Sequence, residues 1–149
     1  MLLESFEAAG FKDEIAAIGD PLFGGETSLY IEEIINKKSD HKIFAVFRGE
    51  KVAGFLILSA VLDEAEILEV AVSENLRRKG IASELMEEIF DWCGKNGIGR
   101  ILLEVRESNS VARNYYERFD FVKDGFRKNY YRNPSEDAVL MSKKLSGAS

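Results

Sequence analysis

The chain has 149 residues, of which 46% are hydrophobic and 31% charged, and its formal net charge is −6 at pH 7. This length and composition predict a soluble globular protein with one full hydrophobic core. The negative charge argues against a general nucleic-acid-binding protein. It suits a cationic acceptor, but plain solubility is the more common reason for such a charge.

The chain holds one cysteine, Cys93, and one histidine, His41, so we expect neither an intrachain disulfide nor a zinc site, and no metal cofactor. No hydrophobic run reaches the ~20 residues of a transmembrane helix. The N-terminus has no basic segment typical of a secretory signal. These features predict a cytoplasmic protein that does not bind a membrane. Cys93 follows Trp92 and has no basic neighbour, which favours a core position over a nucleophile.

The first forty residues predict a short strand or coil and then two helices, near 12–19 and 26–38. The break between the helices is expected at the Pro- and Gly-containing segment 20–25. In the second helix four residues form an apolar stripe, namely Leu29, Ile31, Ile34 and Ile35.

Three strands are predicted next, over 42–48, 52–62 and 66–72, with short turns between them. In the first of them Ile43, Ala45 and Phe47 share one face. Because the connections are short, these strands are expected to form an antiparallel meander.

The second half predicts a helix over 80–93, a strand over 100–106, a second helix ending near 119, and strands near 121–129 and 137–144. Ser108 or Asn109 caps the second helix. Its inward-facing residues are expected to be Val111, Ala112, Tyr115, Tyr116 and Phe119. The predicted fold class is α+β, with a mixed, mostly antiparallel central sheet, flanking helices and a right-handed crossover unit. One domain is expected over 1–145, followed by a disordered tail at 146–149.

A basic loop between a predicted strand and helix has the composition of a phosphate site. Small residues allow a pyrophosphate to approach the free N–H groups of a helix N-terminus, and basic residues add positive charge. The residues concerned are Arg77, Arg78, Lys79, Gly80, Ile81 and Ala82. A solvated basic turn would show the same pattern.

Glu104 and Tyr116 are candidate acid–base groups. Glu104 interrupts a hydrophobic strand on the face of Leu102 and Arg106, and such a setting favours the raised pKa of a general base. An outward-facing glutamate paired with Arg106 is the alternative. Tyr116, on the following helix, could donate a proton to a thiolate or could pack in the core, as its neighbour Tyr115 could.

Asn109 and a pair of tyrosines complete the candidate residues. Asn109 is either a helix cap or a cofactor contact. Tyr130 and Tyr131 could line a substrate groove, although adjacent strand residues point to opposite faces, so that one of them could be core.

Taken together, these residues resemble the GNAT superfamily of acetyl-CoA-dependent N-acetyltransferases, and most of all its ribosomal-protein-alanine N-acetyltransferases. The stretch 77–82 fits the (Gln/Arg)-x-x-Gly-x-(Gly/Ala) loop of the superfamily. A longer and more specific string supports the same resemblance: Leu103-Glu104-Val105-Arg106, Ser108-Asn109, Ala112, Tyr116-Glu117, Phe121, Asn129-Tyr130-Tyr131, Asp137-Ala138 and Met141.

The resemblance implies acetyl-CoA as co-substrate, Glu104 as general base and Tyr116 as general acid. Tyr130 and Tyr131 would face the acceptor, a protein or peptide N-terminus that could belong to a ribosomal protein. The implied cofactor contacts are Val70, Ala71, Val72, Arg77, Arg78, Lys79, Gly80, Ile81, Ala82, Ser83, Asn109 and Tyr116. A monomer or a homodimer is expected.

Two departures from the family pattern concern the turn after the second helix and the acceptor region. Asp120-Phe121 stands where the family has Gly-Phe, and Pro21-Leu22-Phe23-Gly24 replaces a Pro-Trp element. The second departure leaves a small amine or a lysine open as the acceptor. A domain that binds acyl-CoA without turnover is a further alternative, against which the presence of Glu104, Asn109 and Tyr116 argues.

Overall fold

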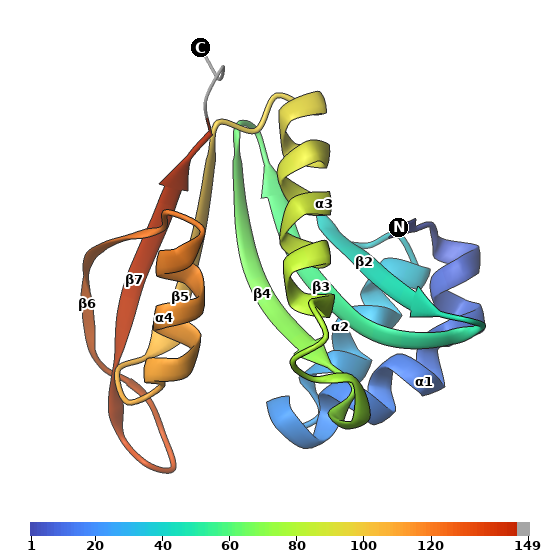
Figure 1. Ribbon diagram of the computed structural model, residues 1–149, viewed down its shortest axis with the longest axis horizontal. Coiled ribbons are helices and arrows are strands. Elements are labelled where there is room, and N and C mark those ends of the chain that lie inside the picture. Colours follow the sequence, from blue (N-terminus) through green and yellow to red (C-terminus); the bar gives the residue numbers. More distant parts are fainter. Residues whose placement is uncertain (146–149) are drawn as a thin grey trace.

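The computed structural model describes residues 1–145, which form one seven-stranded sheet with α-helices on both faces (Figure 1). The strand order is β1-β2-β3-β4-β5-β7-β6, and every pairing is antiparallel except that of β4 with β5. The strands are β1 (Leu2–Leu3), β2 (His41–Arg48), β3 (Lys51–Val61), β4 (Glu64–Val72), β5 (Arg100–Arg106), β6 (Val122–Tyr131) and β7 (Glu136–Lys144). The predicted α+β class is confirmed.

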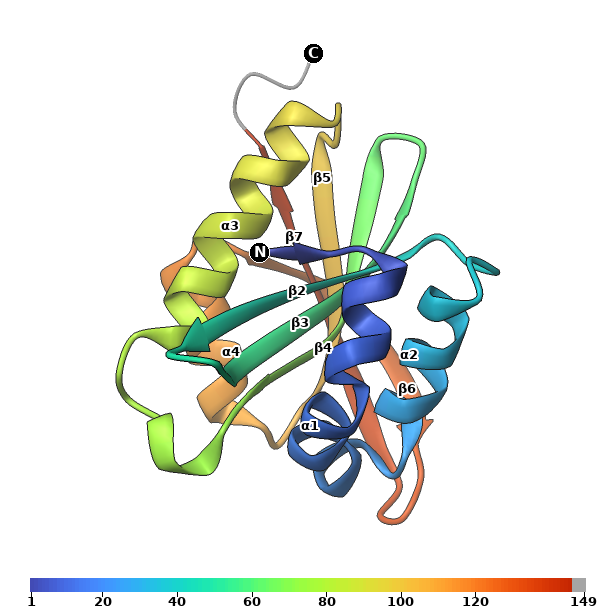
Figure 2. The same ribbon diagram turned by 90° about the vertical axis from the view of Figure 1, so that its right-hand side faces the viewer.

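The helices form two layers, which Figures 1 and 2 show from two directions. On one face α3 (Ile81–Lys95) and α4 (Ser110–Arg118) cover a hydrophobic core that contains Leu85, Met86 and Ile89 of α3. On the other face α1 (Ser5–Phe23) and α2 (Glu26–Ile35) cover a second core. Burial of both faces of the sheet explains the long apolar runs of β2 and β3.

The predicted break between the first two helices was wrong in detail. Helix α1 begins at Ser5 and continues through Pro21 to Phe23. Its start has no Ser, Thr, Asp or Asn cap. Instead, the Oε1 of Glu7 accepts a hydrogen bond from the backbone N–H of Glu4 at 3.0 Å. The chain reverses only at Gly24 and Gly25, where φ is positive.

Two expected inward residues lie outside, since Leu29 of α2 is 65% exposed and Val111 of α4 is 78% exposed. In α2 the buried positions are Thr27, Ile31 and Ile34, which follow the 3.6-residue period and leave Leu29 off that face. Helix α2 also ends at Ile35, three residues earlier than expected.

Cys93 lies in the core, as expected. It is fully buried on α3, and burial raises the pKa of its thiol to about 12. A thiol that stays protonated near pH 7 is a poor nucleophile.

The predicted tail, 146–149, falls outside the described residues. Within residues 1–145, no helix is both long and hydrophobic enough to cross a membrane. The same residues contain no cluster of three or more His, Cys, Asp and Glu side chains that could bind a metal ion.

Glu69 is a buried carboxylic acid at the centre of the sheet. Only 2% exposed, it accepts a hydrogen bond from Oγ1 of Thr27 at 2.6 Å, while its Oε2 has no hydrogen-bond partner. Burial raises its pKa to about 7, despite the opposing effect of the Thr27 hydrogen bond. Glu69 thus links β4 to the first turn of α2. Its ionised form destabilises the folded state because the charge is buried.

Glu69→Gln should therefore make the protein less sensitive to rising pH. The folded-state pKa of Glu69 is above its ordinary value of 4.5. Its favourable contribution is thus complete below pH 4.5 and is lost as pH rises through 7, a loss of about 3 kcal/mol at most. Urea unfolding at pH 4.5, 6 and 8 measures the effect. Glu32→Gln, an exposed residue of α2, is the control, and equal pH slopes for both variants and the wild type would contradict the assignment.

Candidate active site

The site begins where β4 and β5 separate. Their parallel pairing runs from Glu64 opposite Arg100 to Ile67 opposite Leu103 and then stops. Beyond that point the two strands diverge, which is visible in Figure 1. The β4 edge of Val70, Ala71 and Val72 therefore has no strand neighbour on the β5 side, and backbone groups along it are available to a ligand.

A β-bulge at Leu68 bends β4 just where it separates from β5. Ile57 of β3 pairs with Glu69 and Leu58 pairs with Ile67, so Leu68 is an extra residue on β4. A bulge bends its strand and shifts the inward–outward alternation by one residue. After the bulge Val70 and Val72 pack against the α3–α4 core, whereas Glu69 and Ala71 face the α1–α2 core.

The loop after β4 leads to the N-terminus of α3, which lies beside the β4 edge of Val70 to Val72. Gly80 is the N-cap residue of α3 and has a left-handed conformation with φ of 77°. Because glycine has no side chain, it does not occupy the first backbone N–H groups of the helix. Because the first N–H to bond within the helix is that of Glu84, the amides of Ile81, Ala82 and Ser83 lack intrahelical partners. Gly54 of β3 permits the close approach of α3, since a Cβ there would lie 2.8 Å from Cγ2 of Ile81.

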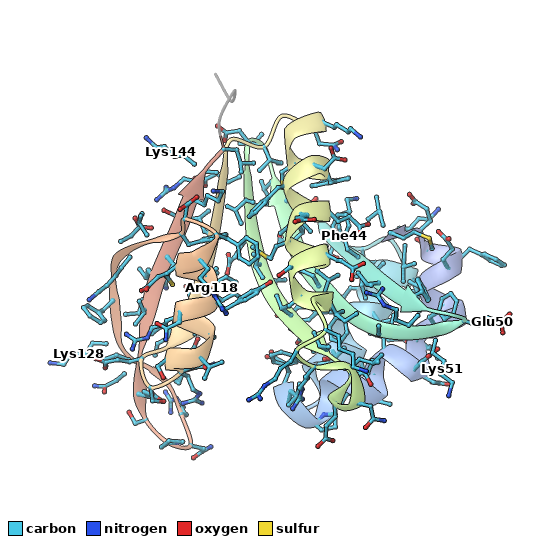
Figure 3. All side chains as sticks on the ribbon, viewed as in Figure 1. Phe44, Glu50, Lys51, Arg118, Lys128 and Lys144 are labelled. Carbon is cyan, nitrogen blue, oxygen red and sulfur yellow. The ribbon has the colours of Figure 1, made fainter. Side chains whose placement is uncertain are left out.

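A cleft of about 660 Å³ lies between the β4 edge, the α3 N-terminus and α4. Eleven of the twelve residues predicted to contact the cofactor line it; only Lys79 does not. The structure adds six lining residues that the sequence did not single out for this role: Leu22, Leu76, Val111, Ala112, Tyr115 and Arg118. Arg118 is labelled in Figure 3, on α4. Its basic side chain near the C-terminal end of α4 is suited to a phosphate contact.

Two adjacent tyrosines of α4 have different roles. The hydroxyl of Tyr115 donates a hydrogen bond to the carbonyl oxygen of Ala82 at 2.7 Å, which ties α4 to the first turn of α3. Tyr116 is 9% exposed and lines the cleft. Burial, and then the nearby Tyr131, raise the pKa of Tyr116, so its phenol stays protonated and can donate a hydrogen bond.

Asn109 is both a helix cap and a residue of the cleft. Its Oδ1 accepts the backbone N–H of Ala112 at 3.1 Å at the start of α4, and the residue also lines the cleft. The cap leaves the amide nitrogen of the side chain free of that bond and able to face a ligand.

Glu104 reaches the gap from the opposite side of the sheet. Its neighbours Leu103 and Val105 belong to the α3–α4 core, so Glu104 points to the α1–α2 face. Its predicted alternative partner was wrong: Oε1 of Glu104 lies 3.1 Å from Nε of Arg127, while Arg106 pairs with Glu136. The sequence did not reveal Arg127 because the contact crosses β7, which is inserted between β5 and β6 in the sheet.

A second carboxylate, that of Glu66, lies near Glu104. Glu66 pairs with Leu102 across β4 and β5, two residues before Glu104 on the same face of β5. Burial, and then the Glu104 carboxylate, raise the pKa of Glu66. Together the two acids make this side of the gap attractive to a cationic amine.

Tyr130 and Tyr131 lie together near Glu104, contrary to the expectation that they face opposite sides. Their ring centroids are 5.1 Å apart in an edge-to-face arrangement. The alternation breaks because Asn129 has φ of 51° and the β6–β7 register shifts between Arg127 and Tyr131. A hydrogen bond with the Glu104 carboxylate raises the pKa of Tyr130. Burial, and then Glu104, raise that of Tyr131 to about 12.

This fold, with a cofactor-sized cleft where two parallel strands part, defines an acyl-CoA N-acyltransferase. Consistent with this, residues 12–121 match the family described as Acetyltransferase (GNAT) family. The chain belongs to the GNAT family and is an acetyl-CoA-dependent N-acetyltransferase. The resemblance found in the sequence is therefore confirmed.

The similar proteins include enzymes named for a protein substrate. The [ribosomal protein bS18]-alanine N-acetyltransferase of Escherichia coli K12 is 36% identical over 105 residues, which are 69% of this chain and 71% of that protein. The crystal structure of the ribosomal-protein-S18-alanine N-acetyltransferase from Escherichia coli has a TM-score of 0.80 at 28% identity, covering 100% of this chain and 96% of that one. Ard1 from Thermoplasma volcanium has a TM-score of 0.76 at 26% identity, with 97% of both chains covered.

Gly80→Ala should weaken acetyl-CoA binding more than it weakens the fold. Alanine in the left-handed conformation costs about 1–2 kcal/mol, which the chain can relieve by moving the first turn of α3. We expect the KM for acetyl-CoA to rise by about tenfold, given the ~1.4 kcal/mol that corresponds to a factor of ten.

Gly97→Ala is the matched control, because Gly97 also has positive φ and open space around it but follows the other end of α3. Both variants should lose similar thermal stability. An equal rise of the KM for acetyl-CoA in both would contradict a role of Gly80 in shaping the cofactor site.

Proposed function

We propose that the enzyme transfers the acetyl group of acetyl-CoA to the N-terminal α-amine of a protein, namely a ribosomal protein that begins with alanine. The observation that carries this proposal is the position of Glu104, Tyr130 and Tyr131 at the side of the strand gap opposite the Tyr116-lined cleft. An acceptor and acetyl-CoA can then meet within the gap. The name of the similar Escherichia coli enzyme supports the same acceptor.

An α-amine suits the modest base that Glu104 provides. Only a neutral amine attacks a thioester, and an α-amine with pKa of ~8 is roughly 20% neutral at pH 7.4, whereas a lysine with pKa of ~10.4 is about 0.1% neutral. The acidic environment of Glu104 and Glu66 attracts the ammonium form, and Glu104, directly or through a water molecule, takes its proton.

Acetyl transfer proceeds by direct attack in a ternary complex. The amine nitrogen forms a bond to the acetyl carbonyl carbon, and the carbonyl oxygen becomes an oxyanion. The nitrogen, now positively charged, loses its excess proton to solvent, and collapse of this intermediate breaks the bond to the CoA sulfur and releases the thiolate. Backbone N–H groups of the unpaired edge at Val70 to Val72 stabilise the oxyanion. Tyr116 donates a hydrogen bond to the departing thiolate. Because its pKa is raised, complete proton transfer from the phenol is unfavourable, and a thiol of pKa ~8.5 leaves well unaided.

Residues 1–145 act as one domain in this proposal, which the single continuous sheet supports.

Arg77, Arg78 and the free amides at the start of α3 hold the pyrophosphate of CoA. A ribosomal acceptor places the reaction in the cytoplasm.

Mass spectrometry of acetyl-CoA turnover tests the acceptor. We expect acetylation of a hexapeptide beginning Ala-Arg at its α-amine, because only that amine is substantially neutral. An N-terminally blocked, lysine-containing peptide should remain unmodified. Transfer to polyamines or aminoglycosides but not to the hexapeptide would overturn the assignment of an N-terminal acceptor. Binding of CoA without transfer to any of these amines would overturn the proposal that the enzyme acetylates them.

Glu104→Gln should lose more activity than Tyr116→Phe. Loss of a general base costs about 10²-fold or more in kcat/KM, whereas loss of one hydrogen bond to a competent leaving group costs about tenfold or less. Steady-state kinetics at pH 7 with the hexapeptide measures both. Glu107→Gln, an exposed glutamate just after β5, serves as the control. Activity of Glu104→Gln equal to that of the wild type would refute its role as base.

A further inference from the structure

Arg106 contacts the loop between β6 and β7 and the first residue of β7. It lies at the C-terminal end of β5, two residues after Glu104 on the same face. Its Nη1 donates to the carbonyl oxygen of Pro134 at 3.1 Å and lies 3.3 Å from Oε2 of Glu136, while its Nη2 donates to the carbonyl oxygen of Arg132 at 3.2 Å. Arg132 and Pro134 belong to the connection between β6 and β7, and Glu136 is the first residue of β7.

The same guanidinium group also lies over the ring of Tyr131, with its Cζ 4.4 Å from the ring centroid. Guanidinium stacking of this kind fixes the plane of an aromatic ring as well as its position. Tyr131 in turn contacts Tyr130 edge-to-face, and the Glu104 carboxylate raises the pKa of both tyrosines. Arg106 thus contacts one ring of a tyrosine pair that lies near Glu104.

Glu136 extends this network to the other side of the site. Its Oε1 accepts the backbone N–H of Ser108, directly before the Asn109 cap of α4. Hydrogen bonds from the Ser108 hydroxyl and N–H, together with Arg106, hold the pKa of Glu136 below its ordinary value. The carboxylate is therefore ionised at neutral pH and available to Arg106.

We propose that Arg106, held by Glu136, is a positioning residue that fixes the 129–136 segment and its two tyrosines for acceptor binding. The proposal rests on the proposed function for the identity of the acceptor. Arg106 does not line the acetyl-CoA cleft, and its direct contacts are to the 131–136 segment, so its main effect should fall on the acceptor.

Arg106→Lys keeps the positive charge but loses the planar fork and the stacking on Tyr131. We expect the KM for the Ala-Arg hexapeptide to rise by about tenfold, with kcat changed less than about threefold and the KM for acetyl-CoA unaltered. Arg100→Lys is the matched control: Arg100 lies on the same face of β5 and pairs with Glu64 at 3.5 Å and with Asp124 at 3.6 Å, at the far end of the strand. It should leave both KM values unchanged.

Hydrogen–deuterium exchange provides a readout that does not need turnover. In Arg106→Lys the amides of 129–136 should exchange several-fold faster than in Arg100→Lys, while those of α3 remain as in the wild type. Glu136→Gln, which keeps an oxygen acceptor for Ser108, should show a smaller effect of the same kind and replaces Arg106→Lys should that variant not fold.

Two results would overturn the proposal: equal exchange of 129–136 in the Arg106 and Arg100 variants, or a parallel rise of both KM values in Arg106→Lys. Inactivity of the wild type toward every peptide would instead overturn the proposed function. In that case the exchange comparison still decides whether Arg106 fixes the segment.

Discussion

The separation of β4 from β5 is the constraint on which the active site depends. A sheet normally satisfies both edges of an interior strand, yet here pairing stops after Ile67 and Leu103. Unpaired backbone groups in the middle of a protein are costly unless water or a ligand takes their place. The gap is therefore stable only because it opens into the cleft, and the bulge at Leu68 bends β4 away from its neighbour. The opening for the cofactor is thus formed by the backbone of β4 and β5.

The gap also divides the chemistry between the two faces of the sheet. Helices α3 and α4 bring free amides, Asn109 and Tyr116 to one side, whereas Glu104 and the tyrosine pair lie on the other. A bulky, anionic cofactor and a cationic acceptor can therefore enter without competing for the same space or charge. The bulge contributes to this division as well, because it turns Glu69 toward α1 and α2 and leaves Val70 and Val72 facing the cofactor side.

The features that the sequence predicted well are those set by local periodicity. Strand β5 has the predicted bounds of Arg100–Arg106, and the face of Glu104 followed from simple alternation. The basic segment 77–82 leads from a strand into α3, as predicted, and all of it except Lys79 lines the cleft. What was missed depends on contacts distant in sequence or on broken regularity: the Arg127 partner of Glu104, the contact between Tyr130 and Tyr131, and the burial of Glu69. Helix α1 was predicted too short because Glu4 and Glu7 cap it without the usual residue types.

In the proposed mechanism, the environments of Glu104 and Tyr116 favour deprotonation of the acceptor over protonation of the thiolate. Glu104 keeps a guanidinium partner in Arg127, whose side chain is 58% exposed, so an arriving ammonium can compete for the carboxylate at little cost. Tyr116, by contrast, is buried among aromatic rings and holds its proton tightly. Removing a proton from the amine is essential for attack, whereas the thiolate is already a stable leaving group. In the proposed mechanism, a partly buried carboxylate whose partner is an exposed arginine therefore accepts the proton of the amine, whereas a buried phenol only orients the leaving thiolate.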